Sequence, residues 1–70
     1  MKLSARNQIK GTVKKITEGA VNNEVVLEIA PGVELTSAIT KQSAQSLGLK
    51  EGSTAYAVVK ASNVMVGVDE

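Results

Sequence analysis

The sequence predicts a small all-β domain with one short helix, and three observations support this fold class. Ten of the 70 residues are valine, a β-branched residue that favours strands. The chain has no Phe, no Trp and one Tyr, so its core must be built from Val, Ile, Leu and Ala. Turn-forming residues separate short apolar segments. At this length we expect a single domain over residues 1–70.

Three strands are expected in the first half of the chain. The first covers residues 3–17, where Gly11 interrupts the apolar pattern and indicates a bulge or bend. The second covers Glu24–Ala30, whose apolar side chains occupy both faces, so a second subunit is a candidate cover for one of them. Pro31-Gly32 is a strong turn signal, and the third strand follows it over Val33–Thr40.

A change of pattern after Thr40 predicts the helix. Thr40 is a good N-cap for a short helix over Lys41–Leu47, and Gly48 occupies the position typical of a helix C-terminus. Ser53–Lys60 is expected to form the fourth strand, and alternating valines predict a fifth strand over Val64, Val66 and Val68. Three strands, a helix and two strands is the order of the five-stranded OB-fold barrel. A small SH3-like barrel is the alternative, and the position of the helix favours the OB-fold.

Composition excludes several classes of protein. With no Cys and no His, the chain cannot form disulfides, and we expect no site for a metal cation. No apolar run approaches the roughly 20 residues that span a bilayer, and the N-terminal residues do not resemble a signal peptide. We therefore expect a cytoplasmic protein that contacts no membrane. A chain this short has a marginal core, so oligomerisation is the expected source of further stability.

The net charge of +1 hides an uneven distribution along the chain. All five charged residues of positions 1–17 are basic, and the four acids of positions 18–34 have no base among them. One interpretation is that neighbouring strands pair opposite charges across the sheet. The other is a local positive field that attracts an anion. The two interpretations are compatible.

Two segments of the chain place hydroxyl groups where an anion could bind. Ser4 and Arg6 are two residues apart, so on a strand both side chains point to the same side. Arg presents five donors in a planar fork that suits oxyanions. Thr40 and Ser43 place two hydroxyls at the free N–H groups of the helix start. A surface Arg beside a Ser, and ordinary helix capping, are the structural alternatives.

The third segment is Lys60-Ala61-Ser62, at the end of the fourth expected strand. Lys60 supplies a mobile charge, and the N–H of Ala61 is free if the ladder ends here; a solvated lysine is the plain alternative. The three segments together offer only donors and contain no carboxylate. A tetrahedral dianion has only acceptors, so it needs a shell of this kind.

The chain resembles the molbindins, the small Mop-domain proteins that bind molybdate or tungstate. The resemblance is carried by Ser4–Gly11, Ala38–Ser43, Leu47–Gly52 and Val59–Val64, in that order along nearly the whole chain. It implies an OB-fold, assembly into a homohexamer as a trimer of dimers, and oxyanion sites between subunits. It also implies that one subunit supplies Ser4 and Arg6 and that its neighbour supplies the other ligands, Thr40, Ser43, Lys60 and Ala61.

From these residues we expect a protein that binds molybdate or tungstate for storage or homeostasis of molybdenum. We expect no enzyme, because a serine nucleophile needs a base and the chain has no His. The first alternative is a single-strand nucleic-acid binder, although such sites use aromatic platforms and this chain offers only Tyr56. The second alternative is a purely structural module for oligomerisation.

Overall fold

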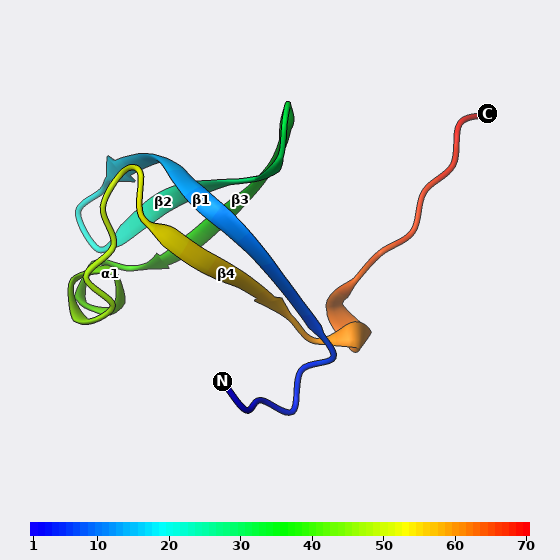
Figure 1. Cartoon of the computed structure of the whole chain (residues 1–70), viewed down its shortest axis with the longest axis horizontal. Helices are drawn as coiled ribbons and strands as arrows, with labels where there is room; N and C mark the ends of the chain where they lie inside the picture. Colours follow the sequence, from blue (N-terminus) through cyan, green and yellow to red (C-terminus); the bar gives the residue numbers. More distant parts are fainter.

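The computed structural model describes all residues, 1–70, and contains four strands, one α-helix and one 3₁₀ turn (Figure 1). The elements in chain order are β1 (Asn7–Glu18), β2 (Asn22–Ala30), β3 (Val33–Thr40), α1 (Lys41–Ser46), β4 (Thr54–Val59) and η1 (Ala61–Asn63). The predicted fold class is confirmed as mostly β with one short helix.

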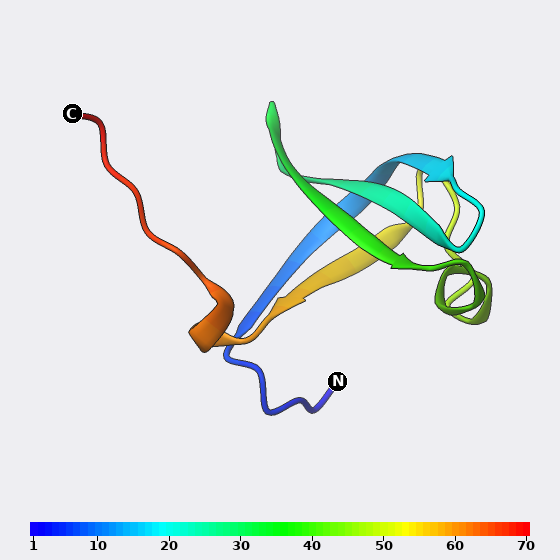
Figure 2. The same cartoon turned by 180° about the vertical axis from the view of Figure 1, so that it is seen from behind.

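One antiparallel sheet with the strand order β3-β2-β1-β4 forms the body of the molecule. The long strand β1 pairs with β2 through its second half and with β4 through its first half. A bulge at Lys14 interrupts the β1–β2 register, and bulges increase local twist. The sheet curls into a half-barrel, with α1 at one end and the two chain termini leaving from the other (Figures 1 and 2).

The sequence indicated a bulge or bend at Gly11, and the structure shows a different role for this glycine. The bulge lies at Lys14, whereas Gly11 lies at a close approach of β2 to β1. A Cβ atom at position 11 would meet the Glu28 carbonyl oxygen at 2.9 Å and Cγ2 of Ile29 at 3.2 Å. Only a residue without a side chain fits this approach unless the backbone moves.

The fifth strand predicted over Val64, Val66 and Val68 is wrong for this chain. These residues follow η1 and adopt no strand, and the sheet contains only β3, β2, β1 and β4. Val66 is 90% exposed and Val68 is 89% exposed. The alternation of valines correctly reports strand propensity, but a strand also needs a partner, and the sequence does not specify one.

Other boundaries differ by a few residues from the predicted ones. Residues 3–6 precede β1 instead of belonging to it. The strand β2 begins at Asn22, two residues before the predicted Glu24, because Asn22 and Asn23 pair with Thr40 and Ile39 of β3. The Asn23 side chain is buried, and its Oδ1 accepts a hydrogen bond from the N–H of Gly19 at 3.4 Å.

The buried core is very small. Five of the 70 residues are buried, and the largest side chain among them that is fully enclosed is that of Val13. Val25 and Leu27 of β2 pack with it, and Ala44 anchors α1. These few buried side chains are fewer than a domain of this length normally encloses.

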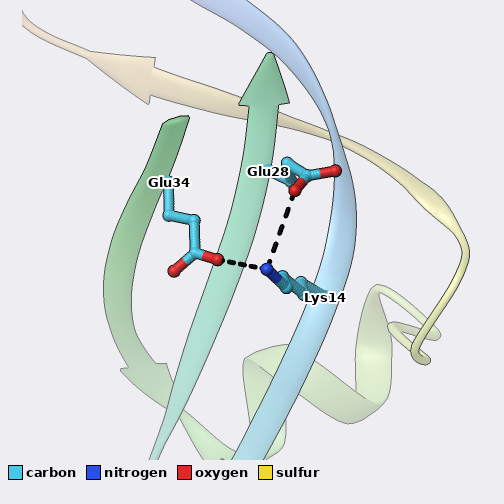
Figure 3. Close-up of polar contacts among 3 residues, drawn as sticks. All are labelled: Lys14, Glu28 and Glu34. Atoms are coloured by element: carbon cyan, nitrogen blue, oxygen red, sulfur yellow. Dashed lines mark hydrogen bonds and ion pairs between the residues drawn. The ribbon is translucent and has the colours of Figure 1, made fainter. Parts of the chain in front are cut away.

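The predicted pairing of charges between neighbouring strands occurs at Lys14 (Figure 3). Its Nζ lies 2.5 Å from Oε2 of Glu34 and 3.7 Å from Oε2 of Glu28, so one lysine of β1 spans two carboxylates on β2 and β3. The hydrogen bond and the charge of Glu34, followed by the charge of Glu28, raise the pKa of Lys14 above its ordinary value. Glu28 and Glu34 are direct cross-strand partners, and like charges at such positions repel unless a cation lies between them.

Candidate functional site

Two segments from opposite ends of the chain form a polar hollow at the end of β1 and β4. The hollow has a volume of about 340 Å³. Six residues line it, namely Ser4, Ala5, Arg6, Lys60, Ala61 and Ser62. Four of the six candidate residues of the sequence analysis, Ser4, Arg6, Lys60 and Ala61, therefore lie together in one chain.

The β1–β4 ladder brings these segments together. Asn7, the first residue of β1, pairs with Val59, the last residue of β4, so the residues just before and just after the ladder become neighbours. Gln8 holds the segment that contains Ser4 and Arg6 in place, because its Nε2 donates a hydrogen bond to the Ala5 carbonyl at 3.1 Å. On the other side, the Asn63 N–H donates to the Lys60 carbonyl at 2.9 Å and closes the η1 turn.

The hollow carries positive charge without a compensating acid. Both ion pairs of the structure involve Lys14, so the charges of Arg6 and Lys60 have no carboxylate within 4.0 Å. No side-chain hydrogen bond of the structure uses Ser4, Arg6, Lys60 or Ser62. These donors are all available to a ligand, and the chemistry that suits them is that of an anion with several acceptor atoms.

Thr40 and Ser43 lie at the other end of the sheet, beside α1. Thr40 ends β3 and is the N-cap of α1, as predicted: its Oγ1 accepts a hydrogen bond from the Ser43 N–H at 3.0 Å. Thr40 also pairs with Asn22, next to the Glu18 end of β1. The hollow lies at the Asn7 end of that strand. The strand β1 has twelve residues, so its two ends lie up to roughly 35 Å apart.

Because of this separation, the six candidate residues of one chain cannot all contact the same anion. A tetrahedral anion is only a few ångströms wide, so a single anion cannot touch both Thr40 and Lys60 of one chain. The resemblance implied that Lys60 and Ala61 act with Thr40 and Ser43 of the same subunit. Within one chain the structure instead groups Lys60 and Ala61 with Ser4 and Arg6.

The six candidate ligands do not include Ala5, Gln8 or Ser62, although Ser62 belongs to the donor segment Lys60-Ala61-Ser62 of the sequence analysis. Ala5 and Ser62 line the hollow, and Gln8 holds the Ala5 carbonyl from outside it. Both Ala5 and Ser62 are adjacent in the sequence to a candidate ligand, and this adjacency is the signal that could have added them. The contact of Gln8 depends on a bend before β1, and the predicted strand that begins at residue 3 did not include this bend.

Comparison with known proteins identifies the family. The TOBE domain matches residues 3–66. Molybdenum-pterin-binding protein 2 of Clostridium pasteurianum is 52% identical over 66 residues, which are 94% of this chain and 97% of the relative. The chain belongs to the Mop proteins of the TOBE-domain family. Its predicted resemblance to the molbindins is thereby confirmed.

Solved structures of the Mop family share the fold. A molybdate-binding protein from Sporomusa ovata is 40% identical, with a TM-score of 0.90, and the match covers 97% of this chain and 100% of that protein. The cytoplasmic molybdate-binding protein ModG, in a form with molybdate bound, is 55% identical with a TM-score of 0.92. That match covers 99% of this chain and 49% of ModG, so the present chain corresponds to about half of it.

Proposed function

We propose that this protein binds molybdate, and also tungstate, as the intact oxyanion. The observation that carries the proposal is the hollow in which Arg6 and Lys60 face no acid and leave their donors free. The names of the relatives support the same ligand, because molybdenum-pterin-binding and molybdate-binding proteins share up to 55% of its residues.

Binding replaces the hydration shell of the anion with fixed donors. The Arg6 guanidinium and the Lys60 ammonium supply charge-assisted hydrogen bonds, each worth about 1.5–3 kcal/mol. The Ser4 hydroxyl and the N–H of Ala61 complete this wall with neutral donors. Sulfate has the same shape and charge as molybdate, so the size of the completed cavity must provide selectivity between them.

The hollow of a single chain is open, and a second chain would enclose the anion. We propose that Thr40 and Ser43 of a neighbouring subunit approach the hollow, because they cannot reach it within their own chain. The assembly that we propose is a homohexamer built as a trimer of dimers. Its expected mass in light scattering is that of six chains.

Calorimetry tests the ligand directly. Titration of micromolar protein with molybdate and with tungstate should release or absorb heat with saturation, whereas sulfate at the same concentration should give a much weaker signal. A titration with molybdate that shows no binding heat across several temperatures would refute the proposal. Several temperatures are needed because the enthalpy of binding can pass through zero at one of them.

We further propose a role in cytoplasmic storage and homeostasis of molybdenum. No helix of the structure has the length and apolar character to cross a bilayer. Elemental analysis of the protein purified from its host should find molybdenum or tungsten at a fixed ratio to protein. Protein that carries neither element after growth with ample molybdate would contradict this role.

A further inference from the structure

The segment that carries Ser4 and Arg6 has few contacts that could fix the direction of its donors. Residues 1–6 precede β1, and none of the nine backbone hydrogen bonds outside the helices and strands involves them. Met1 and Leu3 line an apolar hollow on the sheet, which holds the start of the segment. Apolar contacts have no preferred direction, so they do not fix the rotation of a peptide group. The orientation of the donors therefore needs another source.

Gln8 supplies the one side-chain hydrogen bond that reaches this segment. Its Nε2 lies 3.1 Å from the Ala5 carbonyl oxygen. A carbonyl oxygen can only accept, so the amide nitrogen of Gln8, and not its amide oxygen, must face it. Gln8 is exposed and does not line the polar hollow, whereas Ala5 and Arg6 do. The bond therefore holds the Ala5 oxygen toward a residue that lies outside the hollow.

The Ala5 oxygen and the Arg6 N–H belong to the same peptide group. The chain has no cis peptide bonds, and in a trans peptide group the C=O and the N–H point in opposite directions. Because Gln8 holds the oxygen, the N–H of Arg6 points away from Gln8. No hydrogen bond outside the helices and strands uses this N–H, so it is free to donate. Rotation of the peptide group by half a turn would present an acceptor in place of this donor.

We propose that Gln8 is a positioning residue that keeps the Ala5 carbonyl turned away from the bound oxyanion and the Arg6 N–H turned toward it. This inference rests on the proposed function, because it concerns the same hollow. An anion attracts an N–H and repels a carbonyl oxygen, so the orientation of this one peptide group decides the sign of its contribution. Gln8 thus adds to the affinity without touching the anion.

The size of this effect has an upper limit. Loss of one hydrogen bond lowers the population of the binding-competent orientation by no more than that bond stabilises it. For one hydrogen bond between neutral groups, this limit corresponds to roughly 2- to 13-fold in affinity. The side chains of Ser4, Arg6 and Lys60 remain in the hollow, so binding should weaken and not disappear.

Three variants test this role by calorimetry with molybdate. Gln8→Met keeps a side chain of similar length but removes the donor, so the affinity should fall by roughly 2- to 13-fold. Gln8→His, at about pH 8 where the ring is neutral, restores an N–H donor and should recover most of the affinity. Gln45→Met is the matched control, because the Gln45 side chain makes no hydrogen bond, and it should bind like the unchanged protein.

Two calorimetric results would overturn the proposal. One is a Gln8→Met variant that binds molybdate as tightly as the unchanged protein. The other is a Gln8→His variant that binds no better than Gln8→Met, since the restored donor would then have no effect. Urea midpoints of the variants show whether a loss of affinity accompanies a loss of stability. Because Gln8 is exposed, we expect these midpoints to stay close to that of the unchanged protein.

Nuclear magnetic resonance measures the orientation directly. In isotopically labelled protein, molybdate should move the Arg6 amide proton downfield, because this N–H then donates to an anion, and the shift should be smaller in Gln8→Met. A general loss of stability would not select this one amide. An Arg6 amide proton that does not respond to bound molybdate in the unchanged protein would overturn the proposal, and this measurement needs no variant.

These outcomes are distinct from a failure of the proposed function. If the unchanged protein binds no molybdate, the proposed function is refuted, and the role of Gln8 is refuted with it. If the unchanged protein binds molybdate and Gln8→Met binds it equally tightly, only the role of Gln8 is refuted.

Discussion

The Thr40 hydroxyl makes two hydrogen bonds with the same residue. It accepts from the backbone N–H of Ser43 at 3.0 Å and donates to Oγ of Ser43 at 2.8 Å. The Ser43 hydroxyl therefore receives a hydrogen bond, and its own hydrogen remains free to donate outward. In this pair, Thr40 stabilises the start of α1, and Ser43 is the residue that can offer a donor to a ligand.

Thr40→Val and Ser43→Ala should separate these two roles. Thr40→Val removes the N-cap and should lower the free energy of unfolding by about 1 kcal/mol, the usual cost of a lost cap. Ser43→Ala keeps the capped N–H and should change stability by less than about 0.5 kcal/mol. Urea unfolding measures both values. In calorimetry Ser43→Ala should weaken molybdate binding, and unchanged affinity would show that Ser43 is not a ligand.

Arg6→Ala and Lys60→Ala should each weaken molybdate binding by roughly 10- to 150-fold, the equivalent of one charge-assisted hydrogen bond. Lys50→Ala is the matched control, because it removes the same charge from a residue that does not line the hollow. Its affinity should stay within about twofold of the unchanged protein. Equal losses in all three variants would indicate a diffuse positive field instead of a site.

Gly11→Ala should destabilise the fold by about 1–3 kcal/mol, because the new methyl group would meet the Glu28 carbonyl at 2.9 Å. Backbone atoms cannot yield as a flexible side chain does, so the two strands must move apart. Lys15→Ala, an exposed change on the same strand, serves as the control and should have little effect. Equal urea midpoints for the two variants would show that β1 and β2 tolerate this separation.

The Lys14 ion pairs predict a dependence of stability on alkaline pH. The carboxylates of Glu34 and Glu28 raise the pKa of Lys14, so its charged form is favoured in the folded chain. This contribution is complete below the ordinary lysine pKa of about 10.4 and is lost as the pH rises through the higher folded value. The urea midpoint should therefore fall above about pH 10.4.

Lys14→Met isolates this effect from the titration of other groups. The variant has no charge to lose at position 14, so its midpoint should fall less than that of the unchanged protein between pH 9 and pH 11. The contribution is small, because the ion pairs lie at the surface. Parallel curves for the two proteins would show that the ion pairs do not stabilise the fold.

The sequence is most informative where a local signal decides the structure. Thr40 before a short helix and Pro31-Gly32 between two strands predict these features correctly, because capping and turn formation depend on a few adjacent residues. The fate of Val64–Val68 depends instead on which strand edge is available. No local pattern contains that information, and the predicted fifth strand fails for this reason.

In the candidate site, too, local residue chemistry was predictable from the sequence, whereas the contacts between distant residues were not. Residue chemistry alone identified the donors, and four of them do line one hollow. The reason they meet is the pairing of Asn7 with Val59, a contact between distant parts of the sequence. The length of β1, up to roughly 35 Å, separates Thr40 from this hollow, and this separation likewise becomes apparent only when the strands are assembled.

The very small buried core has a consequence for how this protein is handled. Five enclosed residues are few for a chain of this length, so in the proposed homohexamer much of the folding free energy would come from contacts between chains. The melting temperature of that assembly would rise with protein concentration. Diluting the protein would then favour unfolding.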